Sequence, residues 1–385
     1  MTDRLRTLLH EAAESAGNYV QADHATAPAH HGRFRRPQVL APLTALSLVL
    51  IIGAAFVAVP LLTGSEDPGT APTASASYPR VVTPPAKSSP LPSEPVGVAS
   101  FIYSPCIYAC DPLLVTPTGV QYALPQSPRG EPTASYTLSP DGRWLGDCDA
   151  EGCRLRDLEH TDSRKLRDQG TGRSEIWAWS SNGKWLLLVR HVDGVIKHLE
   201  AINLATGEDR PVIDPTESPL VITDDGALIY ATPGVNGPSL VTADISSGKL
   251  VPRAGITVQA HSQLRNGESV SAQTLSLRLV PDSDLAALDV VAQSPGETVK
   301  RPTAILLVNR TNGHVVRRLP VPPSNWNNDA GVWETASAQP KGILLIHSAP
   351  DHTQIVRLDL TTGKRTVLST LPQGSLLVLR GTNRA

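Results

Sequence analysis

Short stretches of alternating apolar and polar residues run through residues 96–385, and tight turns separate them. One turn is a four-residue motif with Asp-Gly or Asn-Gly at its end, found at 139–142, 180–183 and 223–226, with degenerate copies at 280–283 and 339–342. Asp-Gly and Asn-Gly supply positive φ at low cost, which tight hairpins need. Each motif follows an alternating segment, such as 177–179, and precedes an apolar one, such as 185–188. The pattern predicts a β-hairpin at each position.

A second series of turns follows the first. It lies at 118–119, 206–207, 247–248, 312–313 and 362–363, with a glycine-free version at 159–163. Strands are predicted on both sides of each turn, as in 355–360 and 365–368. Each unit therefore contains four strands, A to D, and repeats about every 40 residues, which is the period of a propeller blade.

The number of turns predicts how the ring closes. There are six C–D turns but five A–B turns, and the first C–D turn has no A strand before it. The chain ends with an apolar segment, 375–379, that no partner strand follows. We expect this segment to complete the first blade, because closure removes the exposed edges of an open sheet. The fold class predicted is all-β, a six-bladed propeller with circular strand closure, and seven blades are the alternative.

The run from Ser139 to Trp144, Ser-Pro-Asp-Gly-Arg-Trp, and its weaker copies resemble the WD40-like repeat of the TolB-type β-propellers. The resemblance covers about residues 96–380 and implies a propeller domain. Ala, Pro and Arg are plentiful, and Arg outnumbers Lys, which is typical of a GC-rich bacterial, actinobacterial-type genome.

An uncharged apolar run, residues 39–62, precedes the repeats. As a helix it would span about 36 Å, enough to cross a bilayer core of about 30 Å. Arg33, Arg35 and Arg36 precede the run, whereas Glu66 and Asp67 follow it. Positive charge stays inside, so we expect a single-pass anchor in the cytoplasmic (plasma) membrane, with the N-terminus inside and the propeller outside. A cleaved signal peptide is the alternative.

Four regions are thus predicted. Residues 1–36 form a short cytoplasmic head, with an amphipathic helix and a disordered basic tail, and 37–62 form the transmembrane helix. Residues 63–95 are rich in Pro, Ser, Thr and Ala, which predicts a disordered stalk, and 96–385 form the propeller. The head loosely resembles the short cytoplasmic heads of bacterial membrane proteins that act on sigma factors.

The loops differ between the two faces of the predicted ring. A–B and C–D turns share one face, here called the turn face, and all are short. B–C loops and D-to-A connections share the other, here called the insertion face. Two large insertions, about 253–275 and 320–331, both fall in D-to-A connections. Insertions gathered on one face indicate a binding face.

The insertions contain candidate ligand-binding residues. Asn325, Trp326, Asn327 and Asn328 combine an indole that can stack on a sugar ring with amides that can bind its hydroxyls. The alternative is a turn-rich loop whose Trp packs on its own blade. His261, in the first insertion, is a further candidate. Trp144 and Trp185 occupy equivalent places in consecutive repeats and are expected to pack within or between blades.

Four cysteines, Cys106, Cys110, Cys148 and Cys153, fall in the B–C loops of adjacent blades. In an exported domain an even number favours disulfides, and Cys148 with Cys153 flank a hairpin loop suited to a cross-strand bridge. Cys106–Cys110 would be the second bridge, although four cysteines allow three connectivities. A four-thiolate zinc site is the competing interpretation.

The chain has a net charge of −2, which excludes a general electrostatic nucleic-acid binder. Walker, HExxH and nucleophile-elbow motifs are absent from the sequence, so we predict neither an enzyme nor a cofactor or metal. The expected function is a membrane-tethered, extracytoplasmic binding or scaffolding module for a protein, a peptide or a cell-envelope glycan. Two alternatives are a transmembrane regulator with an anti-sigma-like head, and a hydrolase or lactonase with its site in the central channel.

Overall fold

The computed structural model describes residues 78–106, 110–126, 136–149, 152–166, 172–193, 195–213, 215, 221–232, 238–271, 277–293, 300–322, 332–373 and 375–381. They belong to the second of two compact units, residues 71–385. The predicted head, transmembrane helix and first part of the stalk, residues 1–77, lie outside the described residues. Within the described part of the chain, we find no helix of the length and apolarity that crossing a bilayer requires.

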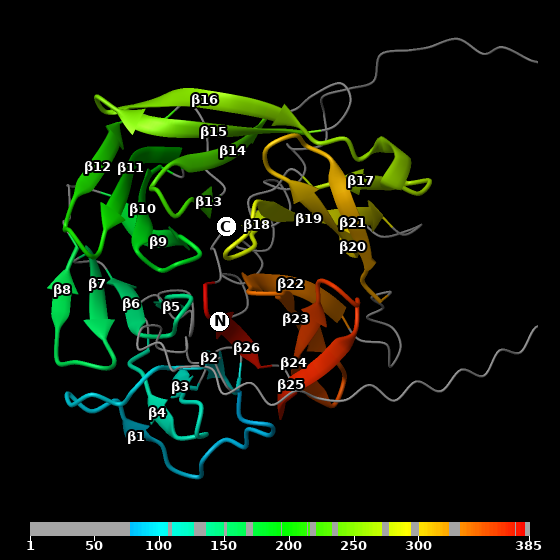
Figure 1. Ribbon diagram of the computed structural model, residues 1–385. Coiled ribbons are helices and arrows are strands. Elements are labelled where there is room, and N and C mark those ends of the chain that lie inside the picture. Colours follow the sequence, from blue (N-terminus) through cyan, green and yellow to red (C-terminus); the bar gives the residue numbers. More distant parts are fainter. Residues whose placement is uncertain are drawn as a thin grey trace, which may run out of the picture. The chain divides into compact units, whose positions relative to one another are not determined.

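Six β-sheets stand around a centre in the described residues, so the six-bladed propeller predicted from the repeat is confirmed (Figure 1). From the centre outward, blade 1 is β26 (Leu376–Leu379), β2 (Phe101–Ser104), β3 (Leu113–Val115) and β4 (Gln121–Ala123). Blade 2 is β5 (Tyr136–Leu138), β6 (Trp144–Asp149), β7 (Gly152–Asp157) and β8 (Ser163–Lys165). Blade 3 is β9 (Arg173–Trp179), β10 (Trp185–Val192), β11 (Val195–Asn203) and β12 (Asp209–Ile213).

The remaining blades repeat this order. Blade 4 is β13 (Val221–Ile222), β14 (Leu228–Thr232), β15 (Ser239–Ser246) and β16 (Lys249–Thr257). In blade 5, β17 (Glu268–Val270) and β18 (Leu277–Leu279) both pair with β19 (Leu285–Gln293), followed by β20 (Lys300–Asn309) and β21 (Val315–Pro320). Blade 6 is β22 (Val332–Gln339), β23 (Gly342–Ser348), β24 (His352–Asp359) and β25 (Arg365–Pro372).

The ring closes with the last strand of the chain. β26 pairs antiparallel with β2, and the register joins Phe101 to Leu379 and Ser104 to Leu376. The C-terminal strand is therefore the innermost strand of the first blade, as the unequal number of turns predicts. Seven blades, the alternative, is wrong. In the described residues each pair of neighbouring blades also shares an apolar cluster, so the core is a ring of interfaces between blades.

The A–B turns of blades 2, 3 and 4 are held by one recurring arrangement, a hydroxyl that accepts a hydrogen bond from a backbone N–H beyond the turn. The hydroxyl of Ser139 accepts a hydrogen bond from the backbone N–H of Trp144 at 2.9 Å, and Ser180 does the same for Trp185 at 2.9 Å. The glycine that ends a turn also serves the neighbouring blade. Gly226 has φ +82°, and a Cβ there would lie 2.7 Å from the indole of Trp185. Trp185 thus packs blade 3 against the turn of blade 4, as predicted.

The C–D turns of blades 2, 3, 5 and 6 share an arrangement that glycine spacing does not reveal. The side chains of Asp157, Asn203, Asn309 and Asp359 each accept a hydrogen bond from the backbone N–H two residues later. Such Asx turns stabilise a reversal without glycine. In blade 2 the Asp157 side chain is fully buried and also accepts a 2.9 Å bond from Arg143 Nε. This explains the glycine-free turn at 159–163.

Residues 78–95, predicted to belong to a disordered stalk, lie against the propeller instead. Residues 78–97, here called the strap, run along the outside of three blades. Val82 N–H donates to Thr370 O at 2.9 Å, which places the strap parallel to β25 on blade 6. Further on, β1 (Ser89–Pro90) pairs parallel with β4 on blade 1. The amides of Val96 and Gly97 both donate to Leu158 O of blade 2 at 2.9 Å.

The composition of the outer strands explains where the strap binds. The outer strands of blades 2 to 5 contain proline or paired basic residues, which protect a sheet edge from unwanted pairing: Arg164, Lys165, Pro211, Pro252, Arg317 and Arg318. By contrast, β4 has neither charge nor proline, and β25 has neither from 366 to 371. The composition of residues 78–95 predicts disorder. Composition does not include the unprotected outer strands β4 and β25, which pair with this segment in the folded chain.

Candidate ligand-binding face

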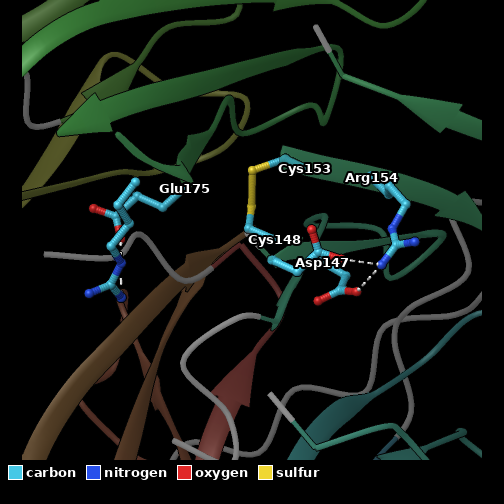
Figure 2. The surroundings of a disulfide bond; sticks show 7 residues. Asp147, Cys148, Cys153, Arg154 and Glu175 are labelled. Atoms are coloured by element: carbon cyan, nitrogen blue, oxygen red, sulfur yellow. Dashed lines mark hydrogen bonds and ion pairs between the residues drawn. A yellow bond between two sulfur atoms is a disulfide. The ribbon is translucent and has the colours of Figure 1, made fainter. Parts of the chain in front are cut away.

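Two disulfides reinforce the insertion face. Cys148 and Cys153 are bonded and lie directly opposite each other in the β6–β7 hairpin, with Cα atoms 4.0 Å apart (Figure 2). Cys106 and Cys110 are bonded between β2 and β3, with Cα atoms 5.6 Å apart. Both predicted pairings are confirmed, and the zinc interpretation is wrong because all four sulfurs are consumed. Each disulfide therefore joins the two sides of a B–C loop, on blade 1 and on blade 2.

A charged group flanks the bridge of blade 2. Arg154 contacts two carboxylates, with Nη2 3.4 Å from Asp147 Oδ2 and 2.6 Å from Asp149 Oδ2. Figure 2 shows Arg154 and Asp147 beside the sulfurs, while Glu175 stands on the neighbouring blade. These ion pairs are partly exposed, so each adds about 1 kcal/mol or less to stability. Their importance is in giving the stapled hairpin a fixed, polar surface.

The first insertion begins later than predicted. β16 continues to Thr257, so residues 253–257 are strand rather than insertion. The connection continues through a short 3-10 helix, η1 (His261–Gln263), and then β17 adds to the edge of blade 5 beside β19. We call residues 258–271 the arm. It starts at the rim, where Gln259 N–H donates to Gly313 O at 3.0 Å, and ends at the inner strand position of blade 5.

One buried carboxylate fixes the arm to its blade. Glu268 Oε1 lies 2.8 Å from Arg318 Nη2 and accepts a 2.8 Å bond from the Thr303 hydroxyl. Its other oxygen accepts a 2.7 Å bond from the backbone N–H of Arg265. Arg318 also donates to Gln263 O at 2.9 Å, so it holds η1 as well. Burial alone would raise the pKa of Glu268, but the bonds from Arg318, Arg265 and Thr303 outweigh it and lower the pKa.

Of the predicted ligand-binding residues, the structure describes only His261. His261 lies at the start of η1 and is exposed, so it projects from an arm that Glu268 and Arg318 hold in place. Asn325, Trp326, Asn327 and Asn328 lie outside the described residues. The arrangement is compatible with a role for His261 in binding, which stays a prediction, as does the role of the loop around Trp326.

Sequence reasoning missed an aromatic group on blade 6. Trp333 stacks on His347 with ring centroids 4.2 Å apart, and His347 meets His352 edge-on at 6.1 Å. His352 Nδ1 lies 2.6 Å from Asp351 Oδ1. Asp351 and His352 are adjacent at the B–C hairpin, so an Asp-His pair at the end of a predicted strand was the available signal. The three rings form an aromatic group beside the B–C hairpin of blade 6, on the insertion face.

The channel wall contains an ion pair, Arg278–Asp289, whose hydrogen bonds are made within blades 5 and 6. Arg278 Nη1 lies 3.2 Å from Asp289 Oδ2, and Arg278 Nη2 donates to Thr335 O at 2.6 Å. The Thr335 hydroxyl donates to Asp289 at 2.5 Å, so the group links blade 5 to blade 6. A nearby cavity, lined by Trp179, Arg278 and Gly381 among others, has a volume of about 30 Å³, room for little more than water. Among the described residues no group of three or more His, Cys, Asp or Glu is placed to hold a metal.

Comparison with known proteins gives structural likeness alone. No family model matches the sequence, and no curated protein matches it. Similar solved structures include TolB from Acinetobacter baumannii, which is 14% identical, with 76% of this chain and 67% of that chain covered and a TM-score of 0.46. An oligogalacturonate lyase from Vibrio parahaemolyticus is 14% identical, with 72% and 80% covered and a TM-score of 0.38. A chain of a nidogen/laminin complex is 11% identical, with 73% and 98% covered and a TM-score of 0.41.

Proposed function

We propose that this protein is a binding module that captures a protein, a peptide or a cell-envelope glycan with its insertion face. The predicted helix at 37–62 tethers the propeller to the cytoplasmic membrane, with the N-terminus inside and the ring outside.

The observation that carries this proposal is the one-sided reinforcement of the ring. Both disulfides lie in B–C loops, and the arm runs from the C–D turn of blade 5 to Glu268, which pairs with Ala292 beside the B–C loop on the same face as the disulfides. The fold does not need them for closure, because β26 already closes the ring. Fixing loops before binding reduces the conformational entropy lost on binding, so rigid loops on one face are what a recognition surface requires.

Photo-crosslinking in intact cells of the source organism tests the proposal. A photoreactive amino acid replaces His261 in the arm or Trp326 in the second predicted insertion, and Lys184 or Lys364, both exposed beside turns, on the turn face. We expect discrete adducts of defined mass from positions 261 and 326 and none from 184 and 364. Adducts confined to the turn face, or the same adducts from both faces, would reject the assignment of the face.

A further inference from the structure

We propose that the strap is a releasable outer clasp, which holds the seam of the ring from outside and whose detachment loosens the inner closure made by β26. The strap lies on blades 6, 1 and 2, whereas the seam lies between the first and last parts of the chain in blade 1. The same seam is thus held at its centre by the C-terminal strand and at its rim by the strap (Figure 1).

The first contact of the strap reaches the inner seam directly. The ring of Tyr78 stacks on Phe101, with centroids 6.1 Å apart and planes 8° apart. Phe101 belongs to β2 and pairs with Leu379 of β26. Gln339 Nε2 of blade 6 donates to the Tyr78 hydroxyl at 3.2 Å, and burial raises the pKa of Tyr78 to about 12. One side chain of the strap therefore joins blade 6 to the strand that receives the last strand of the chain.

The far end of the strap also meets the C-terminus. Ala99, just beyond the strap, donates its N–H to Gly142 O of blade 2 at 2.8 Å. Its carbonyl accepts a hydrogen bond from the guanidinium of Arg380, the residue that follows β26. Arg380 is buried, and Gly381 N–H donates to Leu138 O of blade 2 at 2.9 Å. The two ends of the strap therefore both act on the C-terminal end of β26, through Phe101 at Leu379 and through Ala99 at Arg380.

The contacts at the rim are mostly single hydrogen bonds spaced along the segment, so they can be broken one after another. On blade 6, Val82 is buried with 4% of its surface exposed, and it is flanked by Val81, which is 72% exposed. Most residues between Val82 and β1 are exposed and include two consecutive prolines. Segments with few buried apolar contacts open locally at low cost. Because residues 78–82 are the contacts nearest to the predicted anchor, a pull from the membrane would load them first.

Hydrogen exchange on the full-length protein in detergent tests the proposal. Val82→Glu places a charge at the buried contact, and Val367→Glu is its matched control, because Val367 lies on the same outer strand with 51% exposure. In V82E we expect amide exchange to rise at Thr370 and also, by about tenfold or more, at 101–104 and 376–379. V367E should leave all three unchanged. Faster exchange at Thr370 with unchanged exchange in β2 and β26 would reduce the strap to a passive edge cover and overturn the proposal.

A second variant tests the proposal independently, in case V82E does not fold. Tyr78→Ala removes the ring that touches Phe101 but keeps the backbone bonds of the strap to β25. Exchange at 376–379 should rise in Y78A while the apolar clusters of blades 3 to 5 stay protected. Unchanged exchange at 376–379 in Y78A would contradict the coupling, whatever the behaviour of V82E.

Discussion

The two faces of the ring are stabilised in different ways. On the turn face two solutions recur, a Ser or Thr hydroxyl in the A–B turns of blades 2, 3 and 4 and an Asp or Asn side chain in the C–D turns of blades 2, 3, 5 and 6. On the insertion face each solution occurs on a particular blade: disulfides on blades 1 and 2, and the Glu268–Arg318 pair on blade 5. The recurring turn hydrogen bonds stabilise the fold. The disulfides and the Glu268–Arg318 pair, which do not recur in every blade, mark the surface that we assign to binding. The following variants test this division.

The largest effect on stability should come from the turn face. Asp157→Ala removes a buried carboxylate that accepts bonds from Arg143 and from the backbone N–H of Glu159. We expect the free energy of unfolding, measured with urea, to fall by about 3 kcal/mol. The adducts formed from position 261 should persist in the folded fraction. Their selective loss, with stability unchanged, would mean that the turn face takes part in binding.

A smaller loss of stability should accompany a loss of binding when the blade 2 bridge is removed. The double change Cys148→Ser and Cys153→Ser frees a short loop, which costs about 2 kcal/mol. We expect crosslinked adducts to weaken severalfold, because the hairpin is no longer fixed before binding. The change Cys106→Ser with Cys110→Ser shows whether blade 1 contributes as well. Undiminished adducts in both variants would break the link between stapling and recognition.

The arm should respond to acid. The folded pKa of Glu268 is lowered, so its contribution to stability is fully present above the unfolded pKa of about 4.5 and is lost as pH falls through the folded pKa. Amide exchange at 258–271 should therefore accelerate, after correction for intrinsic rates, as pH drops below about 4.5. Glu268→Gln should loosen the arm at neutral pH and remove this step. A step that survives in E268Q would come from another group.

The smallest effect is expected from exposed charges of the turn face. Lys184→Glu and Lys364→Glu alter side chains that stand in solvent beside turns. Each should change the free energy of unfolding by less than about 0.5 kcal/mol and leave crosslinking from position 261 intact. A severalfold drop in adducts with either change would undermine the distinction between the faces.

Local patterns in the sequence predicted much of the fold. The Asp-Gly turns located the hairpins, the unequal number of turns predicted the pairing of β26 with β2, and the spacing of Cys148 and Cys153 fitted a cross-strand bridge. Contacts between residues far apart in the sequence could not be predicted. Glu268 meets Arg318 fifty residues away, and Val82 pairs beside Thr370 at the other end of the chain. Neither partner has a fixed spacing in the sequence, so only the folded chain brings them together.

Protection from hydrogen exchange in native membranes would show which face of the ring is covered by a ligand. Full-length protein is compared in membrane vesicles that retain envelope components and after purification in detergent. We predict slower exchange in the vesicles at 258–271 and at 148–153, with the turns at 180–184 and 361–364 unchanged. Protection confined to those turns, with the arm and the stapled hairpin exchanging as in detergent, would contradict the account.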